Sequence, residues 1–177
     1  MQTMTLDETH QFLMAGTRTG KLATVREDGR PHLAPIWFVL DGETLIFNTW
    51  YTTVKAQNIR RDPRVSLCVD DDQPPFSFVV VEGTIEILNS TPEEKIEWAT
   101  CIARRYMGDA LAEAFGKRNG VDGELAAAAN SDEIHHGEKC VRLNLFLSLI
   151  FSSKDGLHRQ REVREQHRYI HRVVFVI

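Results

Sequence analysis

The residues best suited to chemistry form one run, 47–63, in which a predicted strand ends and a short helix begins. This run carries three hydroxyl groups, one lysine and two arginines: Thr49, Thr52, Thr53, Lys55, Arg60 and Arg61. A helix start presents unpaired N–H groups and the positive end of the helix dipole, so these residues suit an anion such as phosphate. Lys55 supplies a point charge, and Arg60 or Arg61 could supply a bidentate one. A solvated basic helix with a threonine cap fits the same residues, and local chemistry alone favours it.

Other patterns with chemical potential are weaker. Residues 16–21 resemble a phosphate loop, but three residues separate the glycines instead of four, and a strand follows instead of a helix. His167 and His171 have a metal-compatible helical spacing, and His135 and His136 are adjacent, but surface histidines are the simpler interpretation. No serine, cysteine and histidine pattern indicates a nucleophile. We therefore expect neither a catalytic side chain nor a metal site.

The elements that must position the 47–63 run are strands joined by tight turns. Asp28-Gly29 and Asp41-Gly42 each separate two apolar runs, which is a strong hairpin signal. Asp62-Pro63 must end the helix, because a residue before proline avoids the helical region. After Pro63, apolar and polar residues alternate again from Arg64 to Asp70, which indicates a further strand. The predicted strands are 21–26, 32–40, 44–49, 64–70, 76–88 and 141–151, with Gly83 marking a bulge or bend.

Helices are predicted from capping signals. Thr5 with Glu8, and Thr91 with Glu94, form capping boxes that begin helices, the second reaching about Tyr106. Another helix, 110–117, follows Gly108. Residues 119–139 read mostly as a loop, with a helix allowed at 124–129. Six short strands with a few helices indicate a mainly β protein, a small antiparallel barrel.

Length and composition narrow the class of protein. The chain has 177 residues, 42% apolar and 26% charged, which predicts one folded domain, 1–151, and a basic then apolar tail, 152–177. The sequence has no run of about 18 apolar residues and no signal-peptide pattern at its start, so we expect no membrane partner. Three widely spaced cysteines favour reduced thiols and a cytoplasmic location. A net charge of −4 gives no reason to expect nucleic acid as a partner.

Several of these motifs, taken in order, resemble a known family. "GKLATVREDGRPHLAPIWFVLDGETLIFNTW" and "KAQNIRRDPRVSL" are similar to the split β-barrel flavin and deazaflavin oxidoreductases, the pyridoxamine 5'-phosphate oxidase-like proteins. The branch that uses coenzyme F420 is the most similar. The resemblance implies a six-stranded antiparallel split β-barrel of the FMN-binding type, and a homodimer with cofactor sites at the subunit interface.

The resemblance also implies where the cofactor would bind. Its phosphate would lie at Thr49, Thr53, Lys55 and Asn58, near Arg60. Its ring would lie along the strand that contains His32, Ala34, Pro35, Ile36 and Trp37. Pro35 has no N–H to donate to the ring, and a proline in a strand indicates an edge or a bulge. His32 and Trp37 fit cross-strand packing equally well.

Two functions follow as expectations from the resemblance. The first is an oxidoreductase that binds coenzyme F420 or, less favoured, FMN, and transfers hydride to a small unsaturated substrate. The second is a protein of the same fold that binds or stores flavin, haem or another tetrapyrrole without turnover. The substrate and the direction of hydride transfer cannot be derived from the residues.

Overall fold

A computed structural model describes residues 4–74, 76–121 and 124–136. In these residues the chain forms one antiparallel sheet with four helices around it. The strands are β1 (Gly20–Val25), β2 (Pro31–Ile36), β3 (Val39–Asp41), β4 (Thr44–Trp50), β5 (Arg64–Asp71), β6 (Ser77–Ile87) and β7 (Glu124–His136). Their order in the sheet is β2-β1-β5-β6-β7-β4-β3. The mainly β class is therefore confirmed, and the described residues contain seven strands where the sequence predicts five, the sixth predicted strand being 141–151.

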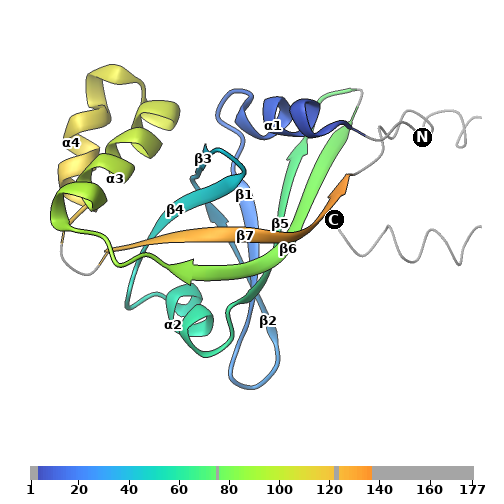
Figure 1. The fold of residues 1–177 in the computed structure, drawn as a ribbon, viewed down its shortest axis with the longest axis horizontal. Coiled ribbons are helices and arrows are strands. Elements are labelled where there is room, and N and C mark those ends of the chain that lie inside the picture. The colour runs from blue at the N-terminus through green and yellow to red at the C-terminus, as the bar shows by residue number, and fades with distance from the viewer. Residues whose placement is uncertain (1–3, 75, 122–123, 137–177) are drawn as a thin grey trace, which may run out of the picture. The chain divides into compact units, whose positions relative to one another are not determined.

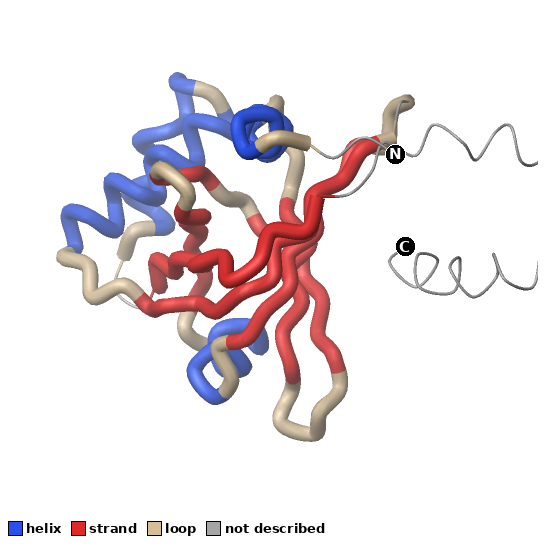
Figure 2. The backbone as a smooth tube through the Cα atoms, turned by 45° about the vertical axis from the view of Figure 1, so that its right-hand side comes forward, coloured by secondary structure: helices blue, strands red, loops and turns tan. Residues whose placement is uncertain are grey.

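The sheet is curved and twisted, and its two edges are consecutive in sequence (Figures 1 and 2). β2 forms one edge and β3 the other, yet only Trp37 and Phe38 separate them. Ile36 and Val39 are three Cα steps apart and so at most about 11 Å from each other, and the sheet must curl for the connection to be made. Pro35 lies on the edge strand β2, as its missing N–H predicts.

The predicted single strand 32–40 is wrong, because it breaks at Trp37–Phe38. The reason is that helix α3 supplies the hydrogen-bond partners of Phe38. The Phe38 N–H donates to Tyr106 Oη at 3.3 Å, and the Phe38 carbonyl accepts from Arg105 Nη1 at 2.8 Å. With both backbone groups bonded to side chains, the chain turns from one sheet edge to the other.

The predicted loop 119–139, and the helix allowed at 124–129, are also wrong where the structure describes them. Residues 124–136 form β7, which pairs with β6 on one side and β4 on the other. Alanine favours helices, but two open strand edges offer more hydrogen bonds than an isolated helical turn. The β6–β7 register shifts between Glu82 and Gly83, as the glycine predicts. The predicted strand 141–151 and the tail 152–177 lie outside the described residues.

Three of the four helices in the described residues begin at threonine caps, as the sequence predicts, whereas the fourth has no side-chain cap and is longer than the predicted 110–117. The helices are α1 (Leu6–Met14), α2 (Val54–Arg61), α3 (Pro92–Met107) and α4 (Asp109–Asn119). Both capping boxes are present, at Thr5 with Glu8 and at Thr91 with Glu94. Gly108 has a φ of 78°, which lets the chain reverse between α3 and α4 so that the two helices pack side by side (Figure 1).

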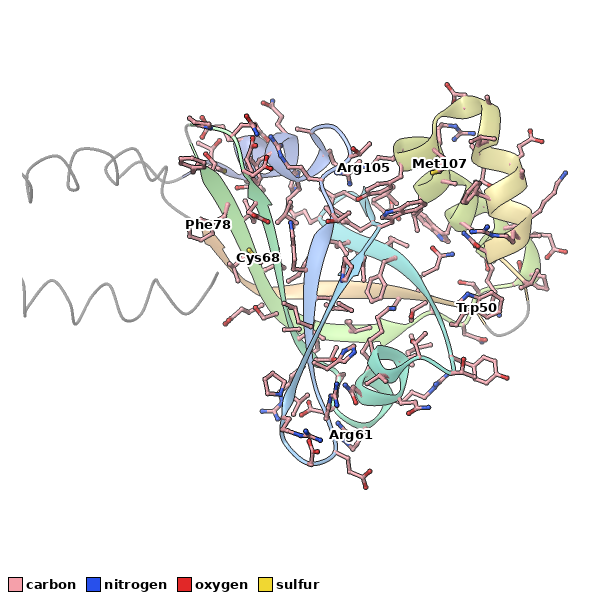
Figure 3. All side chains as sticks on the ribbon, turned by 180° about the vertical axis from the view of Figure 1, so that it is seen from behind. Trp50, Arg61, Cys68, Phe78, Arg105 and Met107 are labelled. Carbon is pink, nitrogen blue, oxygen red and sulfur yellow. The ribbon has the colours of Figure 1, made fainter. Side chains whose placement is uncertain are left out.

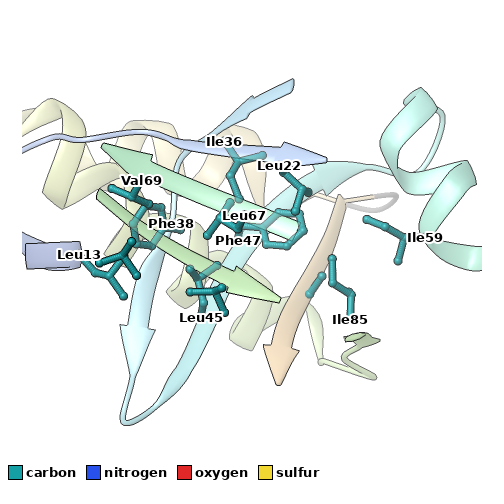
Figure 4. Packing of buried hydrophobic residues seen from close by; sticks show 13 residues of the cluster. Leu13, Leu22, Ile36, Phe38, Leu45, Phe47, Ile59, Leu67, Val69 and Ile85 are labelled. Atoms are coloured by element: carbon teal, nitrogen blue, oxygen red, sulfur yellow. The ribbon is translucent and has the colours of Figure 1, made fainter. Parts of the chain in front are cut away.

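Two clusters of buried side chains hold these elements together. The larger lies on the inner face of the sheet and includes Phe38, Phe47, Leu67 and Val69, none more than 2% exposed (Figure 4). The smaller joins α3 to β3 and β4 through Ile102, Val39 and Ile46. β4 therefore has buried side chains on both of its faces. This packing brings α3 close to the end of β4, where the 47–63 run begins.

Candidate functional site

An open pocket of about 300 Å³ lies where the ends of β2 and β4 meet α2 and the α3–α4 pair. Its lining comes from four parts of the chain: Pro35, Ile36, Trp37, Asn48, Thr49, Trp50, Thr53, Lys55, Ala99, Ile102, Ala103 and Asn119. Six of the nine residues predicted from the sequence are among them. Small-molecule sites usually enclose roughly 300–1,000 Å³, so the pocket is at the small end of that range.

One end of the pocket is polar and belongs to the start of α2. Thr53 is the N-cap: its hydroxyl accepts from the Ala56 N–H at 3.3 Å and donates to the Trp50 carbonyl at 2.8 Å. Thr49, which is 4% exposed, lies 2.9 Å from Thr53, hydroxyl to hydroxyl. Because the Thr53 proton goes to Trp50, the Thr49 hydroxyl is the donor in the bond between the two threonines, and it must turn away from Thr53 to donate to a ligand. Thr53 itself positions the helix start.

The charge at this end is positive. α2 has no acidic residue in its first turn, and Lys55 lines the pocket there, whereas α1, α3 and α4 each begin with acidic residues. The positive end of a helix dipole and a lysine ammonium both attract an anion. The charge arrangement therefore suits a phosphate or carboxylate at the polar end.

The other end of the pocket is apolar. Its lining there consists of Pro35, Ile36 and Trp37 at the end of β2 and Ala99, Ile102 and Ala103 of α3. Ala99 and Ala103 are one helical turn apart and 2% and 1% exposed, so their small side chains leave room against the helix. Trp50, which is 43% exposed, also lines the pocket.

Three predicted site residues lie outside the pocket lining. Asn58 is 3% exposed, and its Nδ2 donates to Thr24 Oγ1 at 3.0 Å, which fixes α2 on β1. His32 Nδ1 lies 3.4 Å from the same hydroxyl. Arg60 is exposed and donates to the carbonyl of Tyr51 at 2.9 Å, so it supports the β4–α2 connection next to the pocket.

Sequence reasoning did not find the α3 and α4 side of the pocket. Among the lining residues that were not predicted, only Asn48 and Trp50 flank a predicted residue, Thr49, so only these two could have been inferred from the sequence. The alanines of α3 carry no chemical signal of their own. Their place in the pocket depends on the packing of α3 over β4, which involves residues more than 50 positions apart.

The described residues offer neither a candidate metal centre nor a membrane-spanning helix. Within residues 4–74, 76–121 and 124–136, no group of three or more His, Cys, Asp or Glu side chains could hold a metal ion. No helix in that part of the chain combines the length and the apolar character needed to cross a bilayer.

Comparison with known proteins identifies the family. The sequence profile of the pyridoxamine 5'-phosphate oxidase family matches residues 6–130, which is well over half of the chain. The chain belongs to this family. The match contains every residue predicted to bind a cofactor.

Individual relatives agree with this assignment. General stress protein 26 of Bacillus subtilis is 32% identical over 93 residues, 51% of this chain and 66% of that protein, which is just under two thirds of its length. A conserved hypothetical protein of Mycobacterium tuberculosis has a similar solved structure, with a TM-score of 0.67 and 27% identity over 77% of this chain and 86% of that one. An F420 reductase has a TM-score of 0.57 and 27% identity over 71% of this chain and 94% of that one.

Proposed function

We propose that the chain is an oxidoreductase that binds coenzyme F420, or less favourably FMN, and transfers hydride to a small unsaturated substrate. The observation that carries the proposal is the pocket itself. It joins a cationic, hydroxyl-lined end to a flat apolar end within a chain of the pyridoxamine 5'-phosphate oxidase family. The 27% identity to an F420 reductase favours the deazaflavin over FMN.

The pocket residues fit a phosphate-bearing ring cofactor. Lys55 would neutralise the phosphate, and Thr49 would donate a hydroxyl hydrogen bond to it, while Thr53 holds the start of α2 in place. Pro35, Ile36 and Trp37 would contact the ring and keep water away from it. When bound, such a cofactor supplies the hydride chemistry, so no side chain need act as a nucleophile.

A second copy of the chain would complete the site. The pocket is small and open, and exposed apolar side chains lie at Trp50, which lines it, and at its sequence neighbours Tyr51 and Val54, which are 43%, 50% and 45% exposed. Exposed apolar groups of this size favour an interface. We therefore propose a homodimer that binds one cofactor per chain. A monomer that binds cofactor at full strength would contradict it.

Titration of the full-length protein with FMN and with coenzyme F420 tests the proposal. Removing the Lys55 ammonium deletes one charged hydrogen bond, worth about 1.5–3 kcal/mol. Lys55→Ala should therefore weaken cofactor binding by about ten- to over a hundredfold. The matched control is Lys117→Ala, because Lys117 is an exposed lysine on α4 outside this pocket. Equal affinity of wild type and Lys55→Ala would rule out the assigned role.

Turnover separates the enzyme from a storage protein. A full-length protein loaded with reduced cofactor should lose cofactor absorbance when a suitable enone or quinone is added. Binding without loss of absorbance across a panel of enones, quinones and tetrapyrroles would favour storage instead.

A further inference from the structure

The indole of Trp37 has Tyr106 stacked on one face and Phe115 tilted beside it, with the Trp37 and Phe115 ring centroids 6.5 Å apart and an interplanar angle of 37°. Its ring lies parallel to that of Tyr106, with centroids 4.9 Å apart and an interplanar angle of 2°. Trp37 lines the pocket and is 37% exposed, whereas Tyr106 does not line the pocket. The part of the indole that meets the pocket is therefore the surface that Tyr106 leaves uncovered.

Tyr106 is held in place by contacts with two other parts of the chain and with its neighbour Arg105. Its hydroxyl donates to the Arg18 carbonyl at 2.8 Å and accepts from the Phe38 N–H at 3.3 Å. The guanidinium of Arg105 lies over its ring, 5.1 Å from the centroid. Burial raises the pKa of Tyr106 above its ordinary value, so the hydroxyl keeps the proton that it donates.

Arg105 extends these contacts to α1 and to the break between β2 and β3. It donates to the carbonyls of Leu13 at 2.6 Å, Gly16 at 3.1 Å and Phe38 at 2.8 Å (Figure 3). The residue after Trp37 is thus bound through its N–H to Tyr106 and through its carbonyl to Arg105. Both the backbone of this segment and the plane of the indole are fixed by α3.

We propose that Tyr106 is a positioning residue that holds the Trp37 indole as a flat wall of the pocket, and that the cofactor ring stacks on the part of the indole that Tyr106 and Phe115 leave uncovered. The inference rests on the proposed function and deepens it. Stacked aromatic pairs gain from parallel, offset contact beyond the area they bury. A wall that is already fixed loses little conformational freedom when the ring binds.

Two half-ligands test this on the full-length protein. Lumiflavin carries the ring without the phosphate arm, and ribose 5-phosphate resembles the arm without the ring. Trp37→Leu should weaken lumiflavin binding about two- to tenfold and leave ribose 5-phosphate within about twofold. Trp37→Phe keeps a flat ring and should restore most of the lumiflavin affinity. Trp98→Phe is the control, because Trp98 packs in the smaller cluster outside the pocket.

The absorbance of bound lumiflavin gives a readout that lost stability does not mimic. A flavin ring stacked on an indole has a long-wavelength charge-transfer absorbance, which should disappear in Trp37→Leu and Trp37→Phe. Tyr106→Phe keeps the ring but loses both hydroxyl hydrogen bonds. It should weaken this absorbance and the lumiflavin affinity without affecting ribose 5-phosphate.

Three outcomes would overturn the inference. One is unchanged lumiflavin affinity and absorbance in Trp37→Leu, and another is unchanged behaviour in Tyr106→Phe. The third is an equal loss of both half-ligands, which would indicate general damage to the pocket. If FMN still binds and still depends on Lys55 in these cases, the proposed function stands while the role of Trp37 and Tyr106 fails. If the wild type binds neither FMN nor coenzyme F420, both fail.

Discussion

Thr53 is the residue whose replacement should reveal most about how the polar end of the pocket is built. It caps α2 through the Ala56 N–H and is also the hydroxyl partner of the buried Thr49. Loss of a threonine cap costs about 1 kcal/mol. Leaving the Thr49 hydroxyl without a partner costs about 1–3 kcal/mol, toward the lower value here because Thr49 lines an open pocket. Thr53→Ala should therefore destabilise the fold by about 2 kcal/mol.

Urea denaturation measures this directly. With a slope of about 2 kcal/mol per molar urea, the midpoint of Thr53→Ala should fall by about 1 M. Thr53→Ser keeps both hydroxyl roles and should stay within about 0.5 kcal/mol of the wild type. A double-mutant cycle with Thr49→Val should give a coupling energy of about 0.5 kcal/mol or more. Equal midpoints for Thr53→Ala and Thr53→Ser would refute the reasoning.

Three further predictions concern packing and ionisation. Gly116→Ala places a Cβ 1.8 Å from Thr100 Oγ1 and 3.0 Å from Thr100 Cα, so α3 and α4 must separate. Urea unfolding should show a loss of about 1–3 kcal/mol, and a wild-type midpoint would contradict this. Burial raises the pKa of Tyr106 above 10.0, so its contribution to stability is complete below pH 10.0 and is lost as the pH rises through the folded pKa. Absorbance titration should show a late-ionising tyrosine that Tyr106→Phe lacks; identical curves would count against it. Burial, and to a smaller extent the nearby Asp70 carboxylate, raises the pKa of the Cys68 thiol. Iodoacetamide at about pH 8 should therefore alkylate Cys68 more slowly in the folded chain than in the urea-unfolded chain. Equal rates would exclude that effect.

Local signals in the sequence predict the boundaries of most elements. Thr5 with Glu8 and Thr91 with Glu94 begin their helices where the capping boxes place them. Gly29 and Gly42 adopt positive φ in the two Asp-Gly turns. Each of these features depends on residues only a few positions apart, so the local sequence is enough to predict it.

Features that depend on distant residues could not be predicted in the same way. The alanine-rich strand β7 forms because β4 and β6 present two strand edges to it. The break at Trp37–Phe38 depends on Arg105 and Tyr106, which lie almost 70 positions further along the chain. The stacking of Trp37 on Tyr106 could not be predicted for the same reason, because no local pattern pairs Trp37 with a residue of α3.

Asn58 illustrates how a residue type can fit two roles. An amide near a helix start suits a phosphate, and the family resemblance implies that role. Its place on α2 directs it toward β1, where Nδ2 donates to the buried Thr24. Thr49 and Lys55, which are on the strand end and in the first turn of α2, line the pocket instead.

A crystal structure of the full-length protein with FMN or coenzyme F420 bound would test the central claim most directly. The account predicts a phosphate at the start of α2, about 3 Å from the Lys55 ammonium, and a ring stacked on Trp37. A cofactor bound elsewhere on the chain, with the pocket between β2, β4 and α2 left to water, would contradict it.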